Sequence, residues 1–228
     1  DDQKKEPTCI SLFSGCGGMD LGFREAGFEI RVMVEWEKKA CDVLRCNWTK
    51  EGIEKAHSGI KPHWFQEREP AILERDITKL STEEILIAAG LQVGEATCVT
   101  GGFPCQGFSF ANGNRTIDDP RNRLYKECVR IVREALPRTF CFENVPGLAQ
   151  MENGRVIKQI CEDLAESGYN LVWDILDAAD YGVPQRRRRI IFTGTRVDFM
   201  KMDFENPEAN PQLYMGAFTR EIKYPDWF

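Results

Sequence analysis

The sequence has no long apolar run, no CxxC pair of cysteines and no internal repeat. No stretch approaches the ~20 apolar residues of a membrane-spanning helix, and the opening DDQKKEPT lacks the form of a signal peptide. Nine cysteines without paired spacing do not indicate a disulfide framework, and an odd number suits a reducing compartment. We therefore expect a soluble, cytoplasmic protein with no membrane partner.

The chain does have enough apolar sequence for a core. Its 228 residues are 42% hydrophobic, which fits one substantial folded domain and the beginning of a second. The formal net charge of −6 argues mildly against nonspecific affinity for nucleic acid. The run QRRRRI at residues 185–190 is a strong local exception, because clustered arginines favour phosphate contacts.

Short β-rich runs alternate with amphipathic stretches along the chain. This alternation predicts an α/β fold, with a mostly parallel sheet and helices on both faces, and ligands that bind off the carboxyl ends of the strands. Ser81 and Glu84 form a capping box before one helix, and the polar residues 49–75 are interpreted as an insertion. We expect strands at residues 8–13, 31–35, 96–102, 139–145, 170–176 and 189–195, and helices at 21–27, 37–48, 83–90, 123–136 and 156–168.

The stretch FSGCGGMDLGF, residues 13–23, follows the first expected strand, which is the position of a nucleotide-binding turn. A dinucleotide fingerprint needs the pattern G-x-G-x-x-G. Gly15 and Gly17 fit, but the third position is Asp20, whose carboxylate would stand where a pyrophosphate must approach, so NAD is disfavoured. An adenosine cofactor without phosphates fits better, and the sulfonium cation of S-adenosylmethionine tolerates nearby carboxylates.

Three further residues extend this candidate cofactor site. Glu35 ends the second strand about 20 residues after the glycines, where an acid can accept hydrogen bonds from both ribose hydroxyls. Trp36 offers a flat face for adenine, and Asp76 could accept a hydrogen bond from the adenine amino group. The alternative interpretation is a glycine turn with ordinary helix-capping acids, and the ordered trio favours the cofactor site.

The stretch GGFPCQGFSF, residues 101–110, places a cysteine in a glycine-rich loop after a strand. A thiol reacts as its thiolate, which backbone N–H groups of such a loop can stabilise, and Pro104 stiffens the backbone before Cys105. On this loop alone, a nucleophile and a packed thiol are about equally well supported. Other cysteines occupy apolar periodic positions and are interpreted as core residues: Cys98, Cys128, Cys141 and Cys161.

Glu143 in FENV shifts this balance towards a nucleophile. A carboxyl at the end of a buried strand, flanked by Phe142 and Val145, is expected to be desolvated, which favours its protonated form. A neighbouring cysteine and acid suggest covalent, acid-assisted chemistry. Carbon 5 of cytosine becomes able to accept a methyl group when a thiolate adds at carbon 6 and an acid protonates ring nitrogen 3.

With these residues assembled, the chain resembles the DNA (cytosine-5) methyltransferase family, of the bacterial restriction-modification type. The pieces FSGCGG, VEW, DI, GGFPCQGFS, FENV and DYGVPQRRRRI occur in the family's order over roughly residues 9–195. The resemblance implies a Rossmann-like S-adenosylmethionine-dependent methyltransferase fold. It also implies S-adenosyl-L-methionine as cofactor and double-stranded DNA as substrate, in a bacterial or phage-infected cell.

The resemblance further implies roles for individual residues. Cys105 would be the nucleophile and Glu143 the acid on a flipped-out cytosine. Arg187 would orient the base through its carbonyl oxygen and the acid, and Arg189 completes the family's R-x-R pair. The implied cofactor pocket comprises Phe13, Gly15, Cys16, Gly17, Gly18, Glu35, Trp36, Asp76, Ile77, Gly102 and Pro104, and the implied DNA-binding catalytic loop includes Gln106, Ser109 and Arg121.

The family continues, after the expected last strand, into a target-recognition domain, a further motif and a final helix that completes the cofactor pocket. None of these is visible in the sequence. Residues 1–197 are therefore expected to form the catalytic cofactor-binding domain, and 198–228 a connector or the start of an incomplete recognition domain. Three explanations are open: the chain is truncated, the sequence leaves out part of the protein, or a second polypeptide supplies the missing part. We expect the isolated chain to bind cofactor weakly and to methylate poorly.

Two alternative functions and a candidate zinc site stay open at this point. The chain could be a non-catalytic, partner-dependent cofactor-binding subunit, although Cys105, Glu143 and Arg187 together speak against it. It could also be an RNA cytosine-5 methyltransferase, although PCQGFS looks more like the DNA enzymes. A zinc site with the ligands Cys41, Cys46, His57 and His63 has nearly suitable spacing. It is disfavoured because its two cysteines face different sides of one expected helix.

Overall fold

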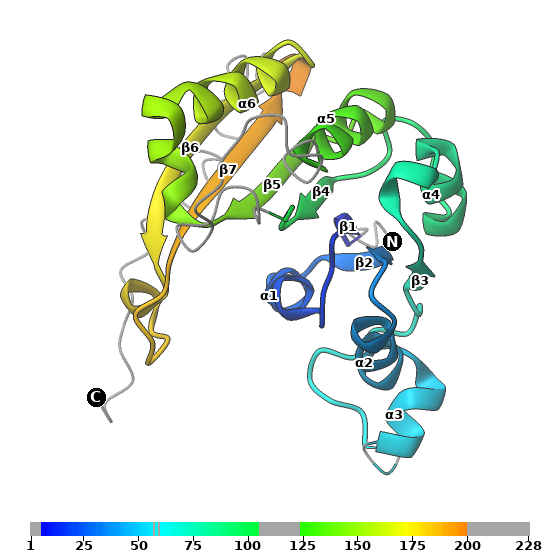
Figure 1. Ribbon diagram of the computed structural model, residues 1–228. Coiled ribbons are helices and arrows are strands. Elements are labelled where there is room, and N and C mark those ends of the chain that lie inside the picture. Colours follow the sequence, from blue (N-terminus) through cyan, green and yellow to red (C-terminus); the bar gives the residue numbers. More distant parts are fainter. Residues whose placement is uncertain (1–5, 57, 59, 105–123, 200–228) are drawn as a thin grey trace, which may run out of the picture.

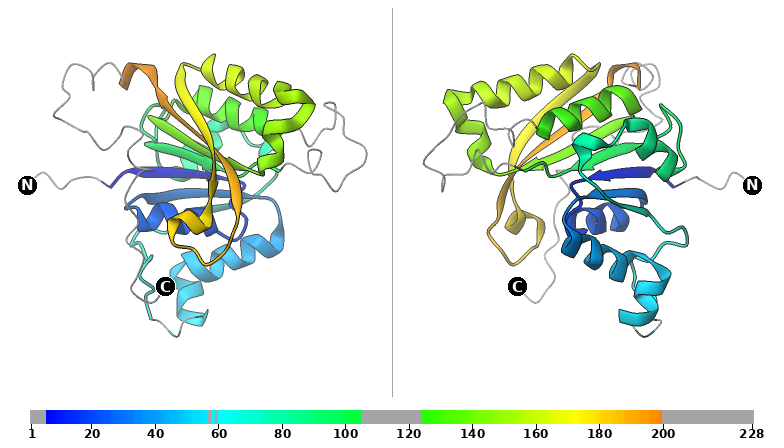
Figure 2. Two further views of the ribbon diagram at one scale, coloured as in Figure 1. Left: turned by 90° about the vertical axis from the view of Figure 1, so that its left-hand side faces the viewer. Right: turned by 45° about the vertical axis from the view of Figure 1, so that its right-hand side comes forward.

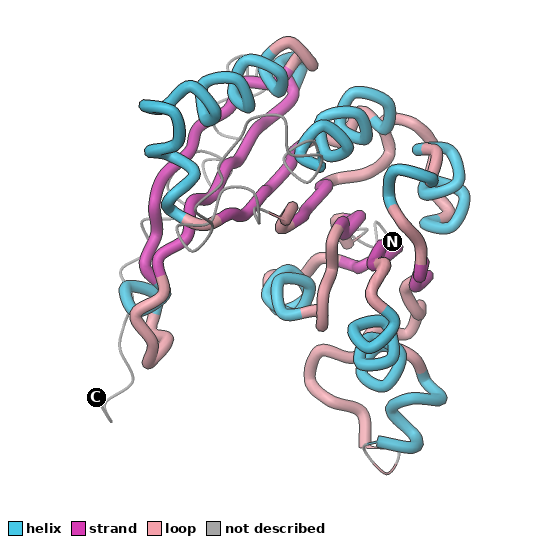
Figure 3. The backbone as a smooth tube through the Cα atoms, viewed as in Figure 1, coloured by secondary structure: helices cyan, strands magenta, loops and turns pink. Residues whose placement is uncertain are grey.

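The computed structural model describes residues 6–56, 58, 60–104 and 124–199. Within these residues, strands and helices alternate along the chain (Figures 1 and 3). Every predicted strand and helix is present, with ends that differ by a few residues. The strands are β1 (Thr8–Leu12), β2 (Glu29–Glu35), β3 (Ala71–Glu74), β4 (Cys98–Gly101), β5 (Thr139–Asn144), β6 (Tyr169–Asp177) and β7 (Arg188–Arg196). The helices are α1 (Gly18–Glu25), α2 (Lys38–Trp48), α3 (Lys50–Ala56), α4 (Thr82–Ala89), α5 (Leu124–Ala135) and α6 (Arg155–Ala165), with short 3-10 segments η1 (Ile77–Lys79), η4 (Pro146–Gly154) and η5 (Ala178–Tyr181).

The strands form one seven-stranded sheet in the order β3-β2-β1-β4-β5-β7-β6. Neighbouring strands from β3 to β5 pair in parallel, whereas β7 pairs antiparallel with both β5 and β6. The prediction of a mostly parallel sheet is thus confirmed. The chain order reverses between β1 and β4, and in such sheets the crevice for a ligand lies beyond the carboxyl ends of the strands at this reversal.

Helices cover both faces of the sheet, as predicted. Figures 1 and 2 show α4, α5 and α6 along one face, and α1 and α2 on the opposite face over the β1–β2–β3 side. Alternation along β1 explains this, because Ile10 and Leu12 join the larger core under α4 to α6, whereas Cys9 joins a smaller core with Leu44 and Trp48 of α2. The apolar side chains of both layers fix where each strand ends, and hence where each loop begins.

The predicted capping box before α4 is confirmed. The Ser81 hydroxyl accepts from the Glu84 N–H at 3.1 Å, and the Glu84 carboxylate accepts from the Ser81 N–H at 2.8 Å. Gly90 follows α4 in the left-handed conformation that ends a helix. This helix is therefore bounded by its own local sequence.

The interpretation of residues 49–75 as an insertion is wrong for its last part. Residues 71–74 form β3, which pairs in parallel with β2 from Val32↔Ala71 to Glu35↔Glu74. An edge strand of four residues, only partly buried, leaves no strong apolar pattern, which is why the sequence did not reveal it. Helix α3 was missed as well, within the same polar stretch.

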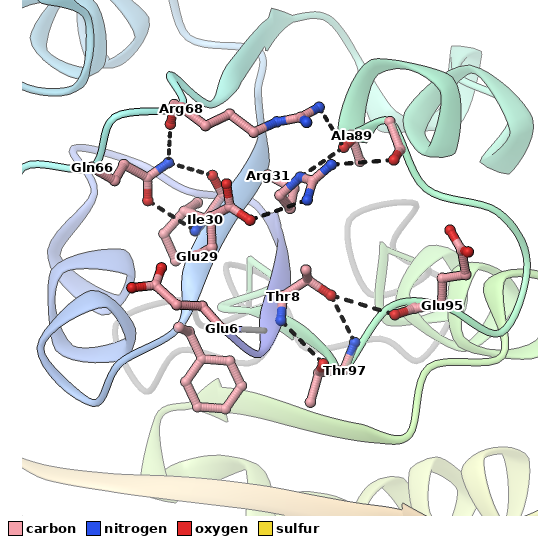
Figure 4. Close-up of polar contacts among 12 residues, drawn as sticks. Glu6, Thr8, Glu29, Ile30, Arg31, Gln66, Arg68, Ala89, Glu95 and Thr97 are labelled. Carbon is pink, nitrogen blue, oxygen red and sulfur yellow. Dashed lines mark hydrogen bonds and ion pairs between the residues drawn. The ribbon is translucent and has the colours of Figure 1, made fainter. Parts of the chain in front are cut away.

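Side chains of this stretch also bind the sheet directly (Figure 4). Gln66 is 6% exposed, and its amide accepts from the Ile30 N–H at 3.0 Å and donates to the Ile30 carbonyl at 2.7 Å. Arg31 and Arg68 donate to the Ala89 carbonyl at 2.9 and 3.2 Å, at the end of α4. The Gln66 amide thus satisfies the backbone N–H and carbonyl of Ile30, as strand β3 does for the residues of β2 with which it pairs.

Candidate active site

The loop between β1 and α1 is held in shape by glycines. Gly15 and Gly17 have φ values of +55° and +85°, which side-chain-bearing residues rarely adopt. A Cβ at Gly17 would lie 2.8 Å from Trp48 Nε1, so helix α2 leaves no room for another residue there. Phe13, before the loop, also has a positive φ, of 53°, and packs against the larger core. The loop therefore turns sharply while its backbone stays close to the ends of the strands.

Glu35 ties this loop to the end of β2. Its side chain is 8% exposed and accepts hydrogen bonds from the N–H groups of Gly15 at 2.8 Å, Trp36 at 2.9 Å and Glu37 at 2.9 Å. A carboxylate has about four acceptor positions, so these three bonds leave capacity for one ligand hydroxyl. Sequence reasoning placed Glu35 at the cofactor but did not foresee that it also shapes the glycine loop.

Further predicted pocket residues follow the ends of β2 and β3. The indole of Trp36 is 72% exposed, and the Arg75 N–H donates to the Glu35 carbonyl at 2.9 Å, which brings the segment after β3 alongside. Asp76 caps η1 and accepts from the Thr78 hydroxyl at 2.8 Å, a bond that lowers the pKa of Asp76. The Ile77 side chain is buried in the core, so only its backbone is free to face a ligand.

The loop after β4 runs past Glu143. A Cβ added at Gly102 would lie 3.2 Å from Glu143 Oε2, and Asn144 Nδ2 donates to the Phe103 carbonyl at 3.0 Å. Asn144 is buried at 2% exposure, and sequence reasoning missed it although it stands in FENV; alternation along β5 was the signal that could have found it. Pro104 is the last described residue of this loop, and four predicted residues lie outside the described part of the chain: Cys105, Gln106, Ser109 and Arg121.

Glu143 forms an ion pair with Arg189. Arg189 Nε lies 2.5 Å from Glu143 Oε1, and the two side chains keep 25% and 30% of their exposure. The antiparallel direction of β7 explains the contact, because β7 starts where β5 ends and Ile190 pairs with Asn144. The arginine run, whose last two residues open β7, therefore reaches the same edge of the sheet as the loops that follow β1 and β4.

Two expectations about this pair need correction. The contact expected between Arg187 and the acid is made by Arg189; Arg187 is exposed, and its N–H donates to Asp177 Oδ1 at 2.9 Å. The expected desolvation of Glu143 is incomplete, because Phe142 and Asn144 occupy the buried positions of β5 and Glu143 lies between them on the other face. The carboxylate is held by a guanidinium and not by an apolar wall.

The described cysteines away from this edge are largely inert core thiols. Burial raises the pKa of Cys98 to about 12, and it raises the pKa values of Cys128 and Cys141 as well. Cys98 and Cys128 are buried as predicted, whereas Cys141 and Cys161 are only partly buried.

The candidate zinc ligands are dispersed. Cys41 is buried and Cys46 exposed on the same helix α2, and His63 Nε2 lies 2.9 Å from Glu25 Oε1. His57 lies outside the described residues. Within the described ranges, no group of three or more His, Cys, Asp or Glu side chains could hold a metal ion, and no helix is long and apolar enough to cross a membrane.

Comparison with known proteins gives matches over most of the chain. The family model C-5 cytosine-specific DNA methylase matches residues 7–222. The chain is 37% identical to Type II methyltransferase M.AquIA of Picosynechococcus sp., over 96% of this chain and 84% of that protein. It is 38% identical to Type II methyltransferase M1.HphI of Haemophilus parahaemolyticus, over 92% of this chain but only 51% of that protein.

A solved structure has the same fold. It is the crystal structure of a protein inferred to be a DNA modification methyltransferase, encoded within a prophage of E. coli. The TM-score is 0.67 at 28% sequence identity, and the match covers 85% of this chain and 48% of that chain. The chain thus spans about half the length of M1.HphI and of this structural neighbour.

Proposed function

The chain belongs to the C-5 cytosine-specific DNA methylase family, and from this premise we propose that it transfers a methyl group from S-adenosylmethionine to carbon 5 of cytosine in double-stranded DNA. The observation that carries the proposal is the Glu143–Arg189 pair at the carboxyl edge of the sheet. Glu143 lies against Gly102, which precedes Cys105 by three residues in the sequence, and this supports the proposal that the acid and the cysteine act on the same base.

The residues of the glycine loop fit S-adenosylmethionine. Glu35 has acceptor capacity left for a ribose hydroxyl, and the positive-φ glycines let the backbone approach an adenosyl group closely. When bound, the cofactor supplies an electrophilic methyl group on a sulfonium cation. Glu35, Trp36 and Asp76 would hold its adenosine part.

Cys105 and Glu143 would act together on the base. The Cys105 thiolate adds to carbon 6 of cytosine, and the electron pair of the ring's 5,6 double bond moves towards carbon 5 as Glu143 donates a proton to ring nitrogen 3. Carbon 5 is then nucleophilic and takes the methyl group. Loss of the proton from carbon 5 to a base restores the double bond and expels the thiolate, and ring nitrogen 3 returns its proton to Glu143. Because the reacting carbons are stacked inside a duplex, the base has to be flipped out.

The arginines of residues 186–189 would serve this chemistry from the next strand. Arg189 fixes the orientation of the Glu143 carboxyl by their ion pair. Arg187, exposed at the same edge, is free to contact the base or a phosphate. The loop that contains Gln106, Ser109 and Arg121 would close over the DNA. We propose that target recognition comes from sequence beyond these 228 residues, on the same or on a second polypeptide.

The experiment that tests this function is a product analysis. The protein, together with a purified polypeptide that supplies target recognition, is incubated with S-adenosylmethionine and with DNA of mixed sequence or with RNA, and the digested nucleosides are analysed by mass spectrometry. We expect 5-methylcytosine in the DNA sample alone. Methylcytosine in RNA alone would show an RNA methyltransferase instead, and cofactor binding without any product would show a non-catalytic subunit.

A further inference from the structure

Arg130 of α5 holds the turn that follows Asp76. Its Nη2 donates to the carbonyl of Ile77 at 3.3 Å and to the carbonyl of Leu80 at 3.0 Å. Ile77 opens η1 and Leu80 is the residue that ends it, so the two bonds span the whole turn. A side chain from a helix 50 or more residues further along the chain thus fixes the backbone directly after Asp76.

The guanidinium of Arg130 is itself fully engaged. Besides the two carbonyls, Nε donates to Glu127 at 2.8 Å, and Nη1 donates to the Thr82 hydroxyl at 3.0 Å and to Glu134 at 3.4 Å. The five N–H donors of an arginine thus have five hydrogen bonds. A lysine, which has three donors on one flexible ammonium, cannot make this pattern.

The position of η1 depends on what packs against it, because it follows β3, an edge strand of four residues that is only partly buried. The Ile77 and Leu80 side chains lie in the larger core, but apolar contacts are non-directional. Helix α5 is firmly seated in the same core through Ile131 and Val132. The directional bonds from Arg130 therefore fix the turn relative to this helix.

The carboxylate of Asp76 is tied to this turn. Its Oδ1 accepts from the Thr78 N–H at 3.0 Å and from the Thr78 hydroxyl at 2.8 Å. Oδ2 keeps acceptor capacity for a ligand, with Lys79 Nζ 3.9 Å away. Asp76 comes two residues after Glu74, which pairs with Glu35 in the register of β2 and β3. The turn therefore sets the place and the direction of Asp76 Oδ2 beyond the end of β3.

We propose that Arg130 is a positioning residue for adenine recognition, because it holds, through η1, the Asp76 carboxylate where that group accepts from the adenine amino group. This inference rests on the proposed function, in which Glu35 and Asp76 hold the adenosine part of the cofactor. A hydrogen bond to a ligand contributes most when the acceptor is fixed before binding. Loss of Arg130 therefore weakens the selectivity for adenine, beyond any effect on the stability of the fold.

The test compares two ligands that differ at one position of the base. S-adenosylhomocysteine carries the adenine amino group, whereas S-inosylhomocysteine carries a carbonyl oxygen in its place. Titration calorimetry gives both Kd values for the wild type and for Arg130→Gln, each with any purified partner polypeptide. We expect the wild type to prefer the adenosyl ligand, and this preference to fall about three- to tenfold in Arg130→Gln. Arg133→Gln removes the same charge from an exposed position of α5 and should leave the preference unchanged.

Asp76→Asn shows whether the two residues act together. The Thr78 N–H and hydroxyl would hold the amide oxygen of the changed side chain, so its NH2 group would face the ligand and could not accept a hydrogen bond. The preference for the adenosyl ligand should then disappear, and the addition of Arg130→Gln should change it no further. Arg130→Lys keeps the charge but not the fork, so it should lose the preference as well and serves as the second variant.

The outcomes separate this inference from the proposed function. An equal loss of affinity for both ligands in Arg130→Gln and Arg130→Lys would show a merely structural residue and overturn the inference. A further fall of the preference when Arg130→Gln is added to Asp76→Asn would overturn it as well, because the arginine would then act elsewhere. Equal binding of the two ligands by the wild type would overturn the inference and leave the proposed cofactor standing. Failure of both ligands to bind the wild type at millimolar concentration would overturn the proposed cofactor, and the inference with it.

Discussion

At the scale of single residues, three carboxylates near one edge of the sheet differ in what surrounds them. Glu35 accepts three backbone N–H bonds, Glu143 pairs with Arg189, and Asp20 has no hydrogen-bond partner among the described residues. Each environment has a different consequence, because hydrogen-bond donors fix a loop, a guanidinium orients an acid, and burial without a partner favours the neutral form of an acid. The residue type alone does not distinguish these environments.

Glu143→Gln tests the acid. The amide keeps the shape of the side chain but cannot donate a proton in the same way, so the rate of methyl transfer should fall by about 10²- to 10⁴-fold. Single-turnover kinetics with DNA measures this rate, and cofactor affinity should stay within about twofold of wild type. Glu162→Gln, on the exposed face of α6, is the control. A rate within threefold of wild type would remove Glu143 from the chemistry.

Asp20→Asn tests the buried charge by stability. Burial raises the pKa of the Asp20 carboxyl from its ordinary value of 3.8 to about 6, so the folded state holds its proton more tightly than the unfolded chain does. Stability is therefore lost as pH rises through this window, and the loss is complete above it. The variant should match wild type closely at pH 4 and exceed its free energy of unfolding by about 3 kcal/mol at pH 8. Urea titrations at both pH values measure this. A constant difference between them would contradict the assignment.

At the scale of elements, the edge of β2 is completed by two different devices. Strand β3 pairs with residues 32–35, and the Gln66 amide satisfies Ile30 further along the same edge. Arg31 reaches from β2 to the carbonyls at the end of α4. The polar stretch from 49 to 75 thus secures the strand that carries Glu35, although little of it is apolar.

Gln66→Ala tests this substitute pairing. Truncation leaves the N–H and carbonyl of Ile30 buried without a partner, and the Arg68 carbonyl loses its bond to Gln66 as well. We expect the free energy of unfolding to fall by about 2 kcal/mol or more. Gln92→Ala is the matched control, because Gln92 is exposed. Equal stability of the two variants in urea titrations would show that water replaces the Gln66 amide.

The same elements show which parts of the fold and of the candidate site the sequence predicts. Periodicity located the strands that carry the glycine loop, Gly102 and Glu143, because buried runs leave a strong pattern. It could not reveal β3, whose four residues are only partly buried, or the antiparallel direction of β7. That direction decides that Arg189 and not Arg187 contacts Glu143. Contacts across strands depend on register, which a single sequence does not encode locally.

At the scale of the whole molecule, charge is unevenly placed. The net charge of −6 repels DNA from most of the surface, whereas residues 186–189 concentrate four arginines at the edge where the candidate active site lies. Arg186 is exposed, with only a distant pairing to Asp177 at 3.8 Å. The electrostatic field should therefore orient DNA towards this edge.

Neutralising Arg186 and Arg188 together tests this orientation. Each arginine that contacts a phosphate releases counterions, so the double glutamine variant should bind DNA more weakly and its salt slope should fall by about 2. Fluorescence anisotropy at several salt concentrations measures the slope. Lys55→Gln with Lys158→Gln removes the same charge from exposed helical positions elsewhere. A salt slope equally reduced in both double variants would contradict a localised DNA site.

We propose above all that Cys105 forms a reversible bond to carbon 6 of cytosine. The most direct measurement uses DNA that carries 5-fluorocytosine, because fluorine at carbon 5 cannot leave as a proton and the sulfur bond should persist. With S-adenosylmethionine and any purified partner polypeptide present, we predict a denaturant-resistant protein–DNA adduct, mapped by mass spectrometry to Cys105 and absent in Cys105→Ser. No adduct across DNA of varied sequence, or an undiminished one in Cys105→Ser, would contradict the account.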